Sequence, residues 1–248
     1  RATGLASEDL EGLSLAEMLT SLVRRTVRSG WRLLLLVDEA EEFLTIERAD
    51  PAVLPRLRRI FQKGPEVRTV LTSTRRLARI DETTSFSTSP FLQGFVPSLY
   101  LTPLAPDECR ALLARGRFTA EETETVLART GCHPFLVQLI ASRLFESRDL
   151  GATLDHVAYD EMVSNFFSVD FQTLDSSERT LLEEAARLSG ASLRELAQAA
   201  GIREEAAEPL LYGLRMMGYL ALEGGKFSLG NWFFERWLRR VEATREAR

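Results

Sequence analysis

One apolar run constrains the fold of this chain more than any other stretch. The five residues from Leu33 to Val37 are apolar without alternation, which is typical of a strand buried on both faces of a helix-covered parallel sheet. The run stops on two carboxylates, Asp38 and Glu39. Open α/β sheets bind ligands at the carboxyl ends of their strands, so this pair marks a candidate site. The alternative is an acidic helix start, in which Glu39, Glu41 and Glu42 only favour the helix dipole.

Two adjacent acids at a strand end can divide the work of phosphate chemistry. The first, Asp38, would hold Mg²⁺ through its water shell, and the second, Glu39, would polarise an attacking water. The sequence therefore predicts a metal-binding role for Asp38 and a catalytic role for Glu39.

A second strand is predicted from Val67 to Thr72, and it also ends on polar residues. Its end would present Thr72, Ser73 or Thr74 to a terminal phosphate or to the attacking water, and Arg75 could neutralise developing charge. A strand end followed by a turn and a solvated basic helix start explains the same residues equally well.

Composition bounds the class of protein. With 45% apolar and 27% charged residues, the 248-residue chain matches a globular protein with one large or two ordinary domains. No apolar run is long enough for a membrane span, and we expect a cytoplasmic protein. The two cysteines, Cys109 and Cys132, show no metal or pairing pattern and are expected to be core thiols. A net charge of −5 argues against a chain built to coat nucleic acid.

The first part of the chain alternates helix and strand, as a parallel doubly wound α/β sheet does. A helix is predicted from Ser14 to Ser29, with Ser14 and Glu17 forming a capping box. A loop follows from Ile46 to Pro51, then a helix from Val53 to Lys63 and a third short strand from Ser98 to Leu101.

After Pro106 the apolar spacing becomes helical. Four helices are expected, forming a small bundle over residues 107–114, 119–130, 134–147 and 154–167. Three more helices (176–188, 192–200 and 204–217), a hairpin around Gly224-Gly225 and a last helix from Trp232 predict a winged helix.

No phosphate-binding loop of the Gly-x-x-x-x-Gly-Lys-Ser/Thr type occurs in the 248 residues. The only lysines are Lys63 and Lys226, and neither has the required neighbours. Either a preceding segment that carries the loop and the first strands is not included in this sequence, or the domain is a degenerate NTPase. Because the sheet would also lack its central strand, we expect an N-terminal segment or a partner chain to complete it.

The chain resembles the AAA+/STAND class of P-loop ATPases. The resemblance rests on Leu33 to Phe43 as a Walker B strand, on Val67 to Arg75 as sensor 1, and on the run from Thr130 to Leu136 (Thr-Gly-Cys-His-Pro-Phe-Leu) as the lid's Gly-x-Pro motif. It implies three domains: an incomplete P-loop NTPase core (1–104), a helical lid (105–170) and a winged helix with a C-terminal helix (171–248).

The resemblance also implies an ATP- and Mg²⁺-dependent switch in signalling or defence. ATP or ADP would lie between core and lid, with Pro134 on the adenine and His133 beside it; spacing alone explains these two residues as a turn and a helix start. The chain departs from the family in having no Walker A lysine, no clear sensor 2 arginine and Gly230-Asn231 in place of a His-Asp pair. These departures put hydrolysis in question, and the resemblance leaves the oligomeric state open.

Two other functions are alternatives to the switch: DNA binding and a non-hydrolysing scaffold. Origin-recognition ATPases combine a similar core with a DNA-binding winged helix, but the third helix of this predicted winged helix begins Arg203-Glu204-Glu205, and a DNA backbone repels such acids. DNA is therefore an unfavoured partner. A non-hydrolysing scaffold of the same fold stays open because the phosphate loop is absent.

Overall fold

The computed structural model describes residues 12–62, 64–73, 91–92, 94–95 and 99–246. The chain divides into two compact units, Arg1–Ser98 and Leu99–Arg248. Within the described residues, no helix is both long and apolar enough to cross a membrane.

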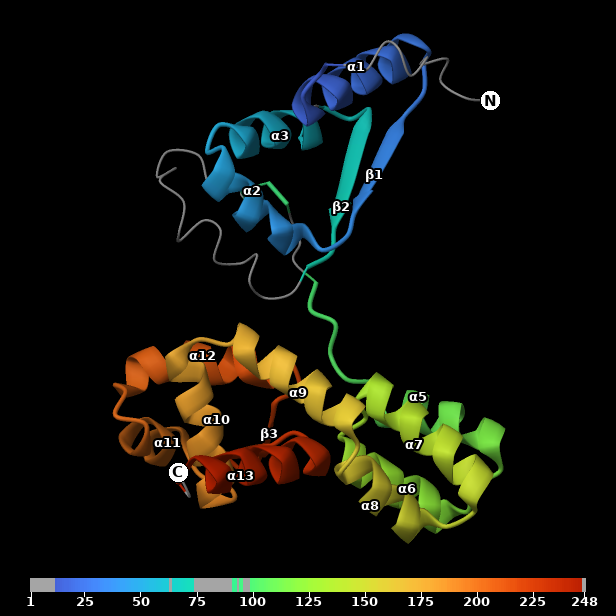
Figure 1. Ribbon diagram of the computed structural model, residues 1–248, viewed down its shortest axis with the longest axis vertical. Helices are drawn as coiled ribbons and strands as arrows, with labels where there is room; N and C mark the ends of the chain where they lie inside the picture. The colour runs from blue at the N-terminus through green and yellow to red at the C-terminus, as the bar shows by residue number, and fades with distance from the viewer. Residues whose placement is uncertain (1–11, 63, 74–90, 93, 96–98, 247–248) are drawn as a thin grey trace. The chain divides into compact units, whose positions relative to one another are not determined.

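The first unit contains two parallel strands with helices on one side (Figure 1). Strand β1 (Leu33–Val37) pairs in parallel with β2 (Val67–Leu71), and Leu33 lies opposite Val67. The helical elements are α1 (Leu15–Arg28), η2 (Ala40–Glu42), α2 (Phe43–Ala49) and α3 (Val53–Phe61). The predicted capping box at Ser14 and Glu17 is confirmed: the Ser14 N–H donates to Glu17 Oε2 at 2.8 Å.

The core of this unit lies between the sheet and its helices. Leu54, Leu57 and Ile60 form the buried stripe of α3, and Val23 faces them from α1. An aromatic cluster of Phe43, Phe61, Phe91 and Phe95 continues this core, with ring centroids 5.5–6.4 Å apart.

The opposite face of the sheet is open, which corrects the prediction of a strand buried on both faces. Leu34 and Leu36 are 58% and 73% exposed, and Val70 on β2 is 50% exposed. We call these three side chains the open sheet face. The unbroken apolar run does form a strand of a parallel sheet, but only one face of that sheet is covered among the described residues. Parallel sheets normally have both faces covered.

The second unit is helical at its start. It contains α5 (Pro106–Leu113), η4 (Ala114–Gly116), α6 (Ala120–Thr130), α7 (Pro134–Ser147), α8 (Leu150–Ala158) and α9 (Glu161–Thr173). Cys109 and Cys132 are free and buried in its core, as predicted. Burial, together with the neighbouring Cys132 thiol, raises the pKa of Cys109 to about 12.

Three further helices and a hairpin follow in the same unit. They are α10 (Ser176–Leu188), α11 (Leu193–Ala199), α12 (Glu204–Met216), β3 (Leu220–Glu223) and β4 (Lys226–Leu229), and α13 (Trp232–Glu246) closes the chain. Strands β3 and β4 are antiparallel, and Ala191 adds an isolated bridge to Phe227. This order agrees with the predicted elements. Phe233, Phe234, Trp237 and Leu238 of α13 are buried in the core, whereas Trp232 is only partly buried.

Three local predictions were wrong. The loop expected from Ile46 to Pro51 is largely helical, because α2 extends to Ala49. The helix expected over 154–167 is two helices, since Asp160 caps α9 through the N–H groups of Met162 and Val163. The strand expected at 98–101 is not formed at Leu99–Leu101, where Leu99 and Leu101 are 84% and 96% exposed. No described strand lies beside this segment to pair with it.

Candidate functional site

Asp38 and Thr72 lie together at the carboxyl end of the parallel sheet. The register pairs Val37 with Leu71, so the next residue of each strand emerges at the same edge. The Thr72 hydroxyl donates a hydrogen bond to Asp38 Oδ1. The backbone holds the two strand ends as well: Thr72 N–H donates to the Val37 carbonyl and Ala40 N–H to the Thr72 carbonyl, both at 2.9 Å. Thr72 therefore positions Asp38, a contact that its predicted role toward phosphate did not include.

The two oxygens of Asp38 have different surroundings. Oδ1 accepts from Thr72 and from the Glu39 N–H at 3.1 Å. Oδ2 has no hydrogen-bond partner within the part of the chain that the structure describes, and the side chain is exposed. An oriented carboxylate with one free oxygen suits Mg²⁺, which keeps several waters and takes one or two carboxylates from the protein.

Glu39 has a left-handed backbone, with φ 53° and ψ 42°. A non-glycine residue rarely adopts this conformation, which costs roughly 1–2 kcal/mol. Here it allows the chain to turn from β1 into η2 while the Glu39 side chain stays exposed. Strained residues of this kind concentrate at functional sites.

The acids that follow differ in environment. Glu41 is buried at 9% exposure, whereas Glu42 is exposed. No group of three or more His, Cys, Asp or Glu residues could hold a metal ion among the residues described. The magnesium role predicted for Asp38 would require water and phosphate oxygens as the remaining ligands.

The other candidate residues after β2 are only partly described. Ser73 is exposed. Thr74 and Arg75 lie outside the described residues, so the structure does not place the predicted arginine.

The second candidate group, His133 and Pro134, begins α7 in the second unit. Pro134 occupies the first turn of the helix, where its missing N–H costs nothing. His133 is the residue before it, and its side chain makes no capping hydrogen bond. The structure thus brings Asp38, Glu39 and Thr72 together in one unit and His133 with Pro134 in the other.

His133 lies in a partly buried polar and aromatic cluster. Its ring packs edge-on against Phe166, with centroids 5.5 Å apart. The buried Nδ1 atom has no hydrogen-bond partner among the described residues. Burial lowers the pKa of His133, and the negative charge of Asp170 partly offsets that effect.

Asp170 and Tyr219 complete this cluster, and sequence analysis did not identify either one. The Tyr219 hydroxyl donates to Asp170 Oδ2. Burial raises the pKa of Asp170, while the Tyr219 hydrogen bond and His133 act in the opposite direction. The cluster joins residues 133, 170 and 219, which share no local motif, so no sequence signal could have found it.

The turn before His133 packs against the end of the β3–β4 hairpin. Gly131 has φ 56°, and a Cβ atom there would lie 2.0 Å from the Gly230 carbonyl oxygen. Asn231 next to it is buried and caps α13 by accepting from the Phe234 N–H at 2.8 Å. The Gly-x-Pro motif and the Gly230-Asn231 pair, more than 90 residues apart in the sequence, are therefore direct neighbours.

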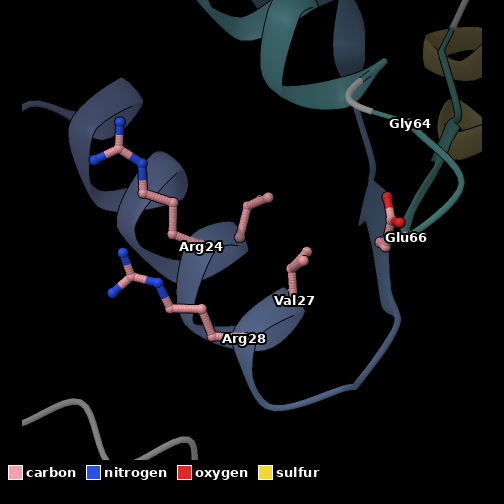
Figure 2. Close-up of a pocket in the computed structure, with 6 residues that line it drawn as sticks. Arg24, Val27, Arg28, Gly64 and Glu66 are labelled. Atoms are coloured by element: carbon pink, nitrogen blue, oxygen red, sulfur yellow. The ribbon is translucent and has the colours of Figure 1, made fainter.

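A shallow hollow in the first unit lies at the wrong end of the sheet for the predicted chemistry. It is lined by Val23 and Val27 of α1 and by Gly64 and Glu66, which precede β2. Figure 2 shows the Arg24 and Arg28 side chains extending away from Glu66. Polar groups do not converge there, and Asp38 follows the other end of β1, so this hollow does not contribute to the candidate site.

Comparison with known proteins supports the fold. No protein-family model and no curated protein sequence matches the chain. Among solved structures, a Walker-type ATPase of Pyrococcus abyssi is similar, with a TM-score of 0.66 and 17% identity. The match covers 93% of this chain and 69% of that protein. The chain therefore has a P-loop ATPase-like α/β fold.

Proposed function

We propose that this chain is the Walker B, lid and winged-helix part of an ATP-binding molecular switch of the AAA+/STAND type. The observation that carries the proposal is the arrangement of Asp38, Glu39 and Thr72 at the carboxyl end of parallel strands. The similarity in fold to a Walker-type ATPase supports the same function.

Each residue has a distinct role in this proposal. Asp38 binds Mg²⁺ through its free Oδ2, and Thr72 and the Glu39 N–H hold the other oxygen in place. Glu39 accepts a proton from the attacking water through its exposed carboxylate. Arg75 stabilises negative charge on the transferred phosphoryl group.

The second unit would contribute the base-binding side. Pro134 presents an apolar surface to the adenine, and His133 lies directly before it at the start of α7. Because Gly131 packs against Gly230, a shift of this turn on nucleotide exchange would also displace the end of the β3–β4 hairpin. That contact offers a route from the nucleotide to the winged helix.

The proposal requires a phosphate-binding loop from elsewhere. We propose that an N-terminal segment or a partner chain supplies it and adds strands to β1 and β2. The open sheet face supports this, because Leu34, Leu36 and Val70 present an apolar surface of the kind that α/β proteins cover.

The test uses the protein that contains this chain together with the segment that supplies the phosphate loop. ATP binding with Mg²⁺ is measured by calorimetry and turnover by phosphate release, for wild type, Asp38→Asn, Glu39→Gln and Glu42→Gln. We expect Asp38→Asn to lose Mg²⁺-dependent binding, and Glu39→Gln to bind ATP but turn over at least 100-fold more slowly, since general-base loss typically costs about 10²–10⁴-fold.

Glu42→Gln is the matched control, because it removes an exposed carboxylate three residues away. It should bind and hydrolyse as wild type does. Unchanged turnover in Glu39→Gln would remove Glu39 as the base. Binding without hydrolysis in the wild type would instead support the scaffold alternative.

A further inference from the structure

Arginine and aromatic side chains alternate in a row on the second unit. The guanidinium of Arg129 lies 4.8 Å from the ring centroid of Trp232, and that of Arg236 lies 4.9 Å from the same ring. Arg236 also lies 4.9 Å from the Tyr159 ring, and Arg240 lies 5.0 Å from it. We call Arg129, Trp232, Arg236, Tyr159 and Arg240 the arginine–aromatic row.

Three helices build this row. Trp232, Arg236 and Arg240 are four residues apart and so share one face of α13. Arg129 comes from the last turn of α6, and Tyr159 follows the end of α8. Figure 1 shows α6 and α8 near α13 within this unit. The row therefore also fastens α13 to the helices that precede it.

The guanidinium carbons lie 4.8–5.0 Å from the ring centroids, and an arginine held over a ring can still use its N–H groups for other partners. The Arg236 edge is partly used: it donates to the Tyr159 hydroxyl at 2.7 Å and lies 3.8 Å from an Asp155 oxygen. Arg129 and Arg240 have no carboxylate partner among the described residues.

Other arginines of this unit are neutralised at shorter range. Arg239 pairs with Glu235 at 2.7 Å, and Arg110 pairs with Glu124 at 2.7 Å. Arg236 and Arg240 lie four residues apart on one helix, where like charges repel each other. The row therefore gathers three positive charges on a chain with net charge −5, and two of them have no carboxylate partner among the described residues.

The geometry points to carboxylates as the groups that bind there. Each ring of the row already has two guanidiniums close to it, which compete with a nucleobase for the ring surface. Planar N–H edges match the two oxygens of a carboxylate.

We propose that the arginine–aromatic row is a docking surface for an acidic peptide segment, whose carboxylates bind to the free edges of Arg129 and Arg240. The stacked rings hold the guanidiniums in fixed orientations, which lowers the entropy lost on binding. This role is separate from nucleotide binding and stands whether or not the chain hydrolyses ATP.

The experiment uses the protein that contains this chain, and a fluorescein-labelled oligoglutamate peptide is the probe. Fluorescence anisotropy gives the affinity at low and at physiological salt. We expect saturable binding that weakens with salt, and a loss of about tenfold or more in the double variant R129Q/R240Q, since a tenfold loss corresponds to about 1.4 kcal/mol.

The matched control is R148Q/R215Q, which removes the same charge from exposed arginines outside the row. It should bind like wild type, and an equal loss in both double variants would overturn the proposal by reducing the effect to net charge. A failure of the wild type to bind oligoglutamate, or tighter binding of an oligothymidylate of equal charge, would overturn it as well.

A third variant, R129K/R240K, keeps the charge but loses the planar fork. It should lose affinity several-fold while keeping the circular dichroism spectrum of the wild type. Wild-type affinity in this variant would refute the paired N–H recognition of carboxylates.

Discussion

A Cβ atom on Gly131 would lie 2.0 Å from the carbonyl oxygen of Gly230. Gly230 is also packed closely against Gly218, because a Cβ on Gly230 would lie 2.0 Å from the Gly218 carbonyl oxygen. Three backbone segments of the second unit thus approach one another where no side chain fits. The turn that leads into α7 and both ends of the β3–β4 hairpin form one rigid junction.

We predict that Gly131→Ala destabilises the second unit by about 3 kcal/mol or more, from overpacking and left-handed strain together. Gly224→Ala is the matched control, because Gly224 has the same φ of 56° but nothing within 4 Å of the added carbon. It should cost only the strain, about 1–2 kcal/mol. Urea unfolding of both variants measures the difference, and equal losses would exclude the Gly230 contact as the cause.

Glu39→Gly should stabilise the first unit. It relieves a left-handed strain of about 1–2 kcal/mol and adds a glycine entropy cost of about 0.5–1 kcal/mol, for a net gain of up to about 1.5 kcal/mol. Amide hydrogen exchange in β1 and β2 would report the gain as increased protection. The control Glu42→Gly, at φ −62°, should lose protection. A loss in Glu39→Gly would show that its side chain stabilises the fold.

Tyr219→Phe should destabilise the second unit by about 1–3 kcal/mol, because the buried Asp170 carboxylate loses a hydrogen-bond donor. Burial raises the pKa of Asp170, so this carboxylate costs stability as the pH rises above its ordinary value of 3.8. The effect of Tyr219→Phe should therefore be larger at neutral than at acidic pH in thermal unfolding. Tyr212→Phe, at a residue 60% exposed, should be neutral at both.

His133 should make the second unit less stable as the pH falls. Its pKa is lowered in the folded state, so the unfolded chain binds a proton first, and stability is lost as the pH falls through the unfolded value near 6.5. One proton limits the slope to about 1.4 kcal/mol per pH unit. His133→Gln should remove this slope between pH 7.5 and 5.5 (about the range in which histidine titrates), and His156→Gln should not.

Most helices of this chain were predictable from local signals. Capping boxes such as Ser192 with Glu195 and Asp175 with Glu178 form at helix starts placed from sequence, and the hairpin around Gly224-Gly225 follows from its turn residues. The meeting of Asp38 with Thr72 was also predictable, because parallel strands end at one edge.

Other features depend on long-range packing and could not be predicted. A strand from Ser98 to Leu101 was expected from its residues, but a strand requires a neighbour to pair with, and composition does not reveal one. The cluster of His133, Asp170 and Tyr219 joins distant segments. The burial of His133 Nδ1 depends on Phe166, which no periodicity connects to it.

The uncovered leucines and valine of β1 and β2 tie the folding of the first unit to assembly. A two-stranded sheet with one apolar face exposed to water gains little free energy from the hydrophobic effect. It would become more stable if further polypeptide packed on that face. The proposed nucleotide site and an apolar layer over the open sheet face would then be completed in a single step. Without the proposed completing polypeptide, the open sheet face would stay in contact with water and the proposed phosphate site would be incomplete.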